Sequence, residues 1–200
     1  MPSRLFCALM CVLHVAGAAL AEPDYNAWLR AAPQRAAEVG RFEAFLRQAK
    51  VADVLPADQL LHNATSWKQC HLAWPYSLPP RPLWPHIVAT LAFVRDEVVP
   101  AIGPVIAESA YRDPGLNGCA GGAPHSAHAL FYAVDLVPAG AIARATLIST
   151  LCRVHRERGQ AHAIGLGFYG GVRFHIDSMR YRLWGADDHR DTSPCLKAPG

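Results

Sequence analysis

Residues 172–177 read Val-Arg-Phe-His-Ile-Asp, so apolar and polar side chains alternate along this segment. Successive side chains of a β-strand point to opposite faces of the sheet. We therefore expect Arg173, His175 and Asp177 on one face and the three apolar side chains on the other, against a core. A chain with such a strand must form a sheet that is covered on one face and carries a polar site on the other.

The rest of the pattern predicts helices first and short strands later. Helical periodicity occurs in three segments, residues 34–51, 85–99 and 141–158. Gly159 follows the third segment in the position of a helix C-cap. Strand-like patterns occupy residues 105–109, 131–137, 163–168 and 172–176, with a hairpin turn at residues 169–171. This order predicts a single-domain α+β fold, in which a small antiparallel sheet packs against helices.

Length and composition favour one globular domain. The chain has 200 residues, of which 52% are hydrophobic and 18% charged, so a substantial core can form and long disordered stretches are disfavoured. The formal net charge of +3 is mild, and no run of Lys and Arg or base-stacking motif accompanies it. We expect a monomer that binds no nucleic acid.

The first 21 residues have the pattern of a secretory signal peptide. Arg4 precedes an uncharged and mostly apolar run, and Ala19-Leu20-Ala21 fits the small-x-small rule for cleavage before Glu22. A single membrane anchor is the alternative, but the run is shorter than the roughly 20 residues that a bilayer span needs. No later segment is long and apolar enough to span. We therefore expect an exported, periplasmic protein that is soluble after cleavage.

Export changes the interpretation of the cysteines. Cys7 and Cys11 belong to the expected signal peptide, and four cysteines remain in the mature chain: Cys70, Cys119, Cys152 and Cys195. An even number in an oxidising compartment favours two disulfides, although four free thiols are the alternative. The sequence does not choose among the three possible pairings.

Two histidines and an aspartate form a candidate metal site. His128 and Asp135 lie in a stretch dense in glycine and polar residues, and His175 follows forty residues after Asp135. Three protein ligands are typical of a catalytic zinc, which keeps a fourth position for water and lowers the pKa of that water to about 7. Because His128 and Asp135 are an odd number of residues apart, one straight strand would point them to opposite faces. We expect His128 before a bend, on the loop that enters the strand of Asp135.

The combined motifs resemble a known family. They are Ser109-x-Tyr111-Arg112, Asn117, Gly121-Gly122-Ala123, Ser126-x-His128, Ala133-x-Asp135 and His175-x-Asp177. Together they resemble the zinc D-Ala-D-Ala carboxypeptidases and related murein endopeptidases, whose wider group includes lysostaphin-type enzymes and the hedgehog domain. The resemblance extends from Trp67 to Trp184. It implies a Zn²⁺-dependent hydrolase of peptidoglycan stem peptides, acting as a D,D-carboxypeptidase or a D,D-endopeptidase.

The resemblance also implies roles for individual residues. His128, Asp135 and His175 would be the metal ligands. Arg112 would bind the terminal carboxylate of the substrate or stabilise the oxyanion, since a guanidinium suits both tasks. Asp177 would act as general base or orient a ligand histidine. Two serines would support the pocket by hydrogen bonds and one tryptophan would line the cleft: Ser109, Ser126 and Trp184.

Three positions depart from the pattern of the family. Phe131 stands where many members have glycine, Val172 where some have an acidic base, and Ser178 where glycine often follows the His-x-Asp motif. The lack of an acid at Val172 motivates an alternative function, a non-catalytic peptidoglycan-binding module on the same fold. We expect an N-terminal helical segment at residues 22–63, a zinc peptidase-like domain at residues 64–190 and a tail at residues 191–200.

Overall fold

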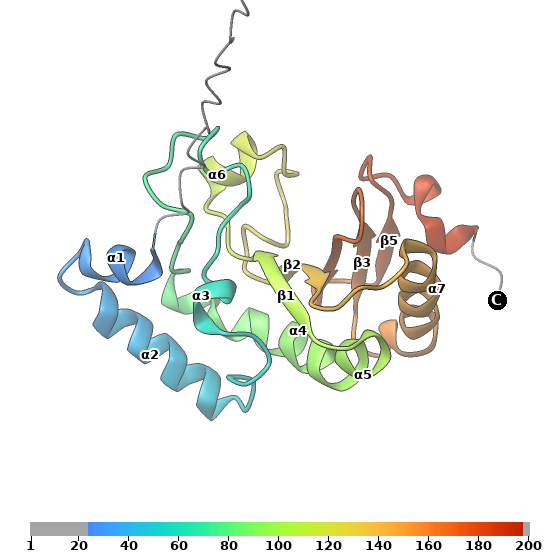
Figure 1. Cartoon of the computed structure of the whole chain (residues 1–200), viewed down its shortest axis with the longest axis horizontal. Helices are drawn as coiled ribbons and strands as arrows, with labels where there is room; N and C mark the ends of the chain where they lie inside the picture. Colours follow the sequence, from blue (N-terminus) through green and yellow to red (C-terminus); the bar gives the residue numbers. More distant parts are fainter. Residues whose placement is uncertain (1–23, 198–200) are drawn as a thin grey trace, which may run out of the picture.

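The computed structural model describes residues 24–197, so the expected signal peptide at residues 1–21 lies outside the described part. Five strands form one sheet in the order β1-β2-β4-β3-β5 (Figure 1). Their bounds are Val105–Ser109, Ala133–Pro138, Gly165–Phe168, Phe174–Asp177 and Arg182–Trp184 for β1 to β5. All neighbouring pairs are antiparallel except β3 and β5. The structure is a single α+β domain, which confirms the predicted fold class.

Helices precede the sheet and also connect its strands. The first three are α1 (Tyr25–Arg30), α2 (Arg35–Gln48) and α3 (Ala57–Leu60). A continuous helical run follows, composed of η1 (Arg81–His86), α4 (Ile87–Phe93), η2 (Val94–Val98) and α5 (Val99–Ile102). The remaining helical elements are α6 (Pro114–Cys119), α7 (Arg144–Val154), η3 (His155–Gly159), η4 (Arg190–Thr192) and η5 (Pro194–Leu196). No helix within residues 24–197 is long and apolar enough to cross a membrane.

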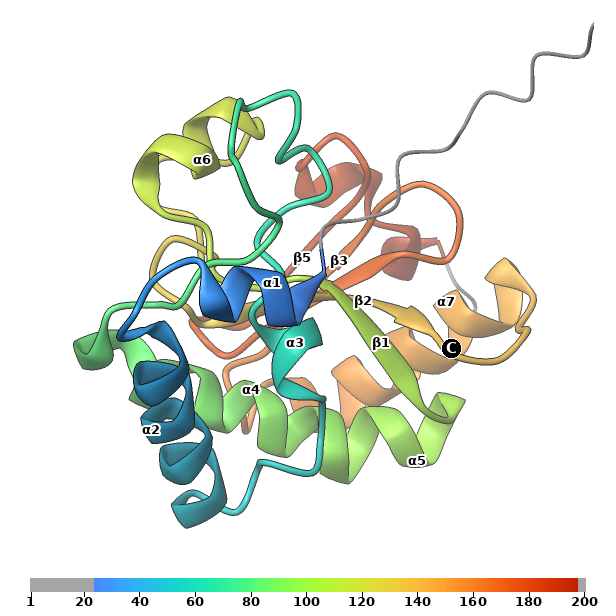
Figure 2. The ribbon, with the colours of Figure 1, turned by 60° about the vertical axis from the view of Figure 1, so that its left-hand side comes forward.

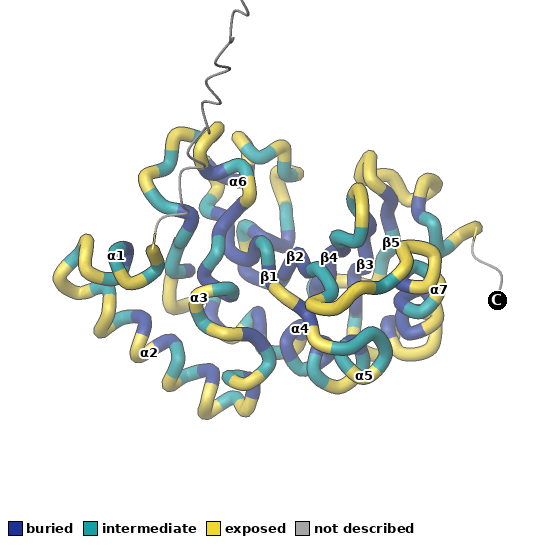
Figure 3. Tube along the Cα trace, in the orientation of Figure 1, coloured by how far each residue is buried: buried dark blue, intermediate teal, exposed yellow. Residues whose placement is uncertain are grey.

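The sheet has two different faces. In Figures 1 and 2, α2, α4 and α5 lie below the sheet, whereas the segment with α6 lies above it. The covered face carries the apolar side chains of the strands, and they join α2 and α4 in one buried core that includes Phe42, Leu91, Val134, Phe174 and Ile176. Figure 3 shows this buried centre, with exposed residues at the loops and helix surfaces. The alternation predicted for residues 172–177 is confirmed, since the apolar residues of β4 lie in this core.

Several expected boundaries were wrong. The second helical run begins at Arg81 rather than Pro85, because a 3-10 turn precedes α4. Gly159 does not cap the third helix, because the helix continues through the π-turn η3 up to this residue. A Cβ at Gly159 would lie 2.9 Å from His155 and 3.1 Å from Tyr181, so the glycine permits close packing instead. The hairpin turn at residues 169–171 is confirmed, with Gly171 at φ +63°.

Phe131 lies before β2 rather than within it. Its backbone has φ +59°, in the left-handed region that favours glycine. Its side chain is fully buried, with its ring centroid 6.0 Å from that of Phe42 and 6.1 Å from that of Tyr111. The position at which many members of the resembled family have glycine therefore keeps the backbone conformation that suits glycine, while the aromatic side chain is held by the core.

Candidate metal centre

The candidate site is built on one cross-strand row of the sheet. Ser109 pairs with Asp135, Asp135 with His175, and His175 with Gly167. Gly167 in turn pairs with Trp184 on β5, so the row crosses all five strands. Side chains at directly opposed positions share a face and lie close together. Strand register therefore brings together residues that are up to 75 positions apart in the sequence.

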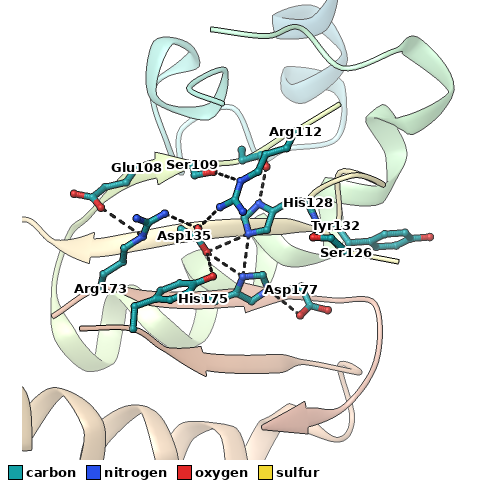
Figure 4. Close-up of polar contacts among 12 residues, drawn as sticks. Glu108, Ser109, Arg112, Ser126, His128, Tyr132, Asp135, Arg173, His175 and Asp177 are labelled. Atoms are coloured by element: carbon teal, nitrogen blue, oxygen red, sulfur yellow. Dashed lines mark hydrogen bonds and ion pairs between the residues drawn. The ribbon is translucent and has the colours of Figure 1, made fainter. Parts of the chain in front are cut away.

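Three buried donor atoms converge at the centre of this row (Figure 4). Nε2 of His128 lies 3.1 Å from Oδ1 of Asp135 and 3.1 Å from Nδ1 of His175, and that Nδ1 lies 3.0 Å from the same oxygen. Ligand atoms of a tetrahedral zinc ion, with bonds of about 2.0–2.1 Å, are about 3.3 Å apart. The donor set and its spacing therefore fit a divalent metal ion of the zinc type, as the sequence predicted for His128, Asp135 and His175.

The position of His128 follows from the turn that carries it. His128 lies in the turn that precedes β2 rather than on that strand, which confirms the predicted bend. The backbone N–H of His128 donates to Oγ of Ser126. Nδ1 of His128 lies 2.6 Å from the carbonyl oxygen of Ala110 and can donate only if it carries the proton. This contact favours the tautomer in which Nε2 keeps a lone pair for the metal. Burial lowers the pKa of His128 to about 4, which likewise favours the neutral ring.

His175 is oriented from behind by Asp177. Nε2 of His175 lies 3.0 Å from Oδ2 of Asp177, so the opposite ring nitrogen, Nδ1, faces the site. Asp177 is fully buried and also accepts hydrogen bonds from the backbone N–H of Met179 and from Arg182. Burial opposes the charge of Asp177, but the hydrogen bond from His175 and the nearby Arg182 outweigh it and hold the pKa of Asp177 below its usual value. A Cβ at Gly165 would lie 2.1 Å from Oδ2 of Asp177, so this glycine provides the space.

Asp135 is held by two guanidinium groups. Its Oδ2 accepts hydrogen bonds from Nη2 of Arg112 at 2.5 Å and from Nη2 of Arg173 at 2.7 Å, which leaves Oδ1 toward the two histidines. Burial alone would raise the pKa of Asp135, but its contacts with His128 and His175 hold the pKa well below its usual range. Asp135 is therefore an ionised carboxylate, as a metal ligand must be.

Arg112 and Arg173 are themselves fixed by neighbours. Nε of Arg112 donates to Oγ of Ser109 at 2.9 Å, and that hydroxyl contacts the carbonyl oxygen of Asn63. Nε of Arg173 lies 3.6 Å from a carboxylate oxygen of Glu108. Arg173 was predicted to share the face of His175, but its contact with Asp135 was not predicted. The signal for this contact is the two-residue spacing of Arg173 from His175, because Arg173 directly precedes β4 and continues its alternation.

A cavity of about 600 Å³ opens beside the three donor atoms. Of the residues predicted for the site, five line it: Arg112, Ser126, His128, His175 and Trp184. The ring of Trp184 stands edge-on to the ring of His175, with 4.7 Å between the centroids. A Cβ at Gly167 would lie 2.1 Å from the Trp184 ring, so the glycine makes room for the tryptophan. Tyr169, which the sequence pattern placed only in the hairpin turn, also lines the cavity.

Two disulfides hold segments that border the cavity. Cys70 pairs with Cys119, directly before the glycine-rich wall formed by residues 120–123, and Cys152 pairs with Cys195, beyond Arg190 at the rim. The structure thus selects one of the three pairings that the sequence left open. Disulfides of this kind are typical of proteins from oxidising compartments.

The family comparison decides what class of protein carries this site. Residues 62–177 match the family model described as Peptidase M15. The chain belongs to the peptidase M15 family. The match contains all three candidate ligands and ends at Asp177, whereas α1 to α3 and β5 lie outside it. Comparisons with curated proteins and with solved structures gave no match. As an M15 metallopeptidase, the chain keeps the complete His-Asp-His set in a buried, metal-compatible geometry.

Proposed function

We propose that this M15 peptidase is a periplasmic, zinc-dependent hydrolase of peptide bonds in peptidoglycan stem peptides. The observation that carries the proposal is the convergence of His128, Asp135 and His175 within 3.1 Å of one another at the edge of an open cavity. A zinc ion held by these residues would polarise a carbonyl group and activate water for attack on an amide. The two disulfides support an extracytoplasmic location.

The other site residues support this chemistry by orienting the ligands. Arg112 and Arg173 both donate hydrogen bonds to Oδ2 of Asp135, and these bonds fix the carboxylate with Oδ1 facing the two histidines. We propose that Asp177 orients the ring of His175 and does not act as the general base. Its carboxylate is fully buried and contacts the ring nitrogen that points away from the site, so it does not reach a substrate in the cavity.

The charge of the cavity supports an anionic substrate. Arg180 and Arg190 line the cavity, are exposed, and form no ion pair within residues 24–197. Asp188 is the acidic residue among those that line it. Arg112 and Arg182, by contrast, are paired with Asp135 and Asp177. The free guanidinium groups of Arg180 and Arg190 can bind carboxylates, and stem peptides carry free carboxylates. We therefore propose the rim arginines as binding groups, with Ser126 and Trp184 lining the same space.

A binding module without catalysis is the second candidate. Val172 has no proton-accepting group where some members have an acid, and Asp177 is buried behind His175. Both observations leave the general base unassigned. In a pure binding module the cavity would recognise wall peptide, and the metal would have a structural role or none.

One experiment separates the two functions. The mature chain, residues 22–200, is incubated with zinc and purified peptidoglycan, and the products are identified by mass spectrometry. We expect released D-Ala for a carboxypeptidase or resolved cross-links for an endopeptidase, with loss of both after chelation and in His175→Ala. Tight sedimentation with the wall material and no product would support the binding module. Full activity after chelation and in His175→Ala would overturn the metallopeptidase proposal.

A further inference from the structure

Tyr169 places a hydroxyl group directly beside the candidate metal centre. Its Oη lies 3.0 Å from Oδ1 of Asp135, the same oxygen that lies 3.0 Å from His175 and 3.1 Å from His128. Tyr169 also lines the cavity in which a substrate would bind. The residue thus combines contact with the candidate ligand oxygen of Asp135 and access to the substrate space.

The backbone and ring of Tyr169 are held in place by two arginines. The carbonyl oxygen of Tyr169 accepts a hydrogen bond of 2.9 Å from Arg144, and its N–H donates to the carbonyl oxygen of Arg173 at 3.1 Å. The guanidinium carbon of Arg173 lies 5.0 Å from the centroid of the Tyr169 ring. A donor fixed in advance loses little reorganisation energy when charge develops next to it.

The other donors around Asp135 are already engaged. Arg112 and Arg173 both donate to Oδ2 of Asp135, on the far side of the carboxylate from the two histidines. A carboxylate oxygen that binds a cation has less negative charge left to accept a hydrogen bond. When Oδ1 of Asp135 coordinates a metal ion, the neighbouring phenol is therefore the donor that is most easily redirected into the cavity. Burial and the charge of the neighbouring Asp135 raise the pKa of Tyr169 above its usual value, so its hydroxyl carries its proton at neutral pH.

We propose that Tyr169 is a catalytic residue whose hydroxyl donates a hydrogen bond to the carbonyl oxygen of the scissile amide as that oxygen becomes negative. No covalent bond to Tyr169 forms, and its proton stays on the phenol throughout. This role rests on the proposed peptidase function. It differs from a positioning role, in which Tyr169 would act only by orienting Asp135 for the metal.

The chain offers a matched control for the test. Tyr169→Phe removes the hydroxyl and keeps the ring. Tyr132→Phe makes the same change at a tyrosine that does not line the cavity and whose ring is stacked on His86 with 4.2 Å between centroids. Three quantities are measured for the wild type and both variants: zinc affinity by competition with a chelating dye, the kcat for cleavage of a peptidoglycan peptide, and the Kd of a phosphinate analogue of that peptide. The phosphinate mimics the tetrahedral, negatively charged transition state, and an uncleavable reduced-amide analogue of the same peptide serves as the ground-state comparison.

For Tyr169→Phe we expect a kcat lower by about 10²-fold to 10³-fold, the size seen when one oxyanion donor is removed. The phosphinate should bind more weakly by a similar factor, while zinc affinity and binding of the reduced-amide analogue stay within about threefold. Tyr132→Phe should match the wild type in every measurement. A drop in zinc affinity with kcat restored at saturating zinc would overturn the proposal in favour of positioning. Unchanged kcat and unchanged phosphinate affinity would overturn it as well. A wild-type protein that neither cleaves the peptide nor binds the phosphinate would instead overturn the proposed function, and the role of Tyr169 with it.

Discussion

Oδ2 of Asp177 lies 3.0 Å from Nε2 of His175, on the side of the imidazole ring opposite to the nitrogen that faces Asp135. This contact sets which nitrogen of His175 is available to a metal ion. It also separates the two roles that the family resemblance left open for Asp177. A residue that orients a ligand acts through metal affinity, whereas a general base acts on the rate of the chemical step.

Replacement of Asp177 by alanine distinguishes these roles. We expect the zinc affinity of Asp177→Ala to fall by about 10-fold to 100-fold, as is usual when a group that orients a ligand histidine is lost. Activity should largely return at saturating zinc, because no group that contacts the substrate has been removed. Isothermal titration with zinc and a rate measurement over a range of zinc concentrations check both points. If zinc affinity is unaltered and kcat falls and is not restored by excess zinc, Asp177 acts in proton transfer instead.

Gly167 is expected to be required for the position of Trp184. A Cβ in Gly167→Ala would lie 2.1 Å from the indole ring, so the ring must move away from His175. Such overpacking costs about 1–3 kcal/mol of the free energy of unfolding. Gly170→Ala in the adjacent turn is the matched control, since a Cβ there meets nothing within 4 Å. In chemical denaturation, the free energy of unfolding should fall clearly for Gly167→Ala and change by no more than about 0.5 kcal/mol for Gly170→Ala.

Phe131 combines an unfavourable backbone conformation with a favourable buried side chain. Truncation of a buried phenylalanine costs about 3–5 kcal/mol, whereas left-handed backbone in a residue other than glycine costs roughly 1–2 kcal/mol. Both Phe131→Gly and Phe131→Ala should therefore destabilise the protein. The glycine variant should be the more stable of the two by about 1 kcal/mol, because it alone relieves the backbone at φ +59°. Equal or reversed stabilities of these variants in thermal unfolding would contradict this interpretation.

The rim arginines are expected to contribute to substrate binding rather than to the reaction rate. In the double variant Arg180→Gln and Arg190→Gln, KM for a stem peptide with free carboxylates should rise about tenfold while kcat changes little. The same peptide with amidated carboxylates should show a much smaller difference between wild type and variant. Arg156→Gln, an exposed arginine of η3 outside the cavity, is the control. Identical effects on both peptides would rule out carboxylate recognition at the rim.

The fold class and the metal ligands could be predicted because their signals are local. The alternation of residues 172–177 determines which side chains share the face of His175, and this depends only on strand geometry. The odd spacing of His128 and Asp135 predicted a bend between them, and Phe131 with its positive φ lies in that bend. Family motifs then identified which of the polar residues belong to one site.

Other features of the site could not be predicted, because they depend on contacts between distant segments. The parallel pairing of β5 with β3 places Trp184 beside Gly167, and no periodicity in either segment indicates this register. Gly159 was misread as a cap because glycine serves both for left-handed backbone and for close packing, and only the neighbouring side chains distinguish these uses.

The sequence by itself determined the alternation of the strands, the three ligands through their motif and the even number of cysteines after residue 21. Only the tertiary structure decided the disulfide pairing, the two arginines on Asp135 and the position of Tyr169. Local periodicity follows from the geometry of a single strand or helix, which neighbouring residues specify. The direction in which Tyr169 and Arg173 meet Asp135 depends on how β2, β3 and β4 align, and that alignment results from packing of the whole core.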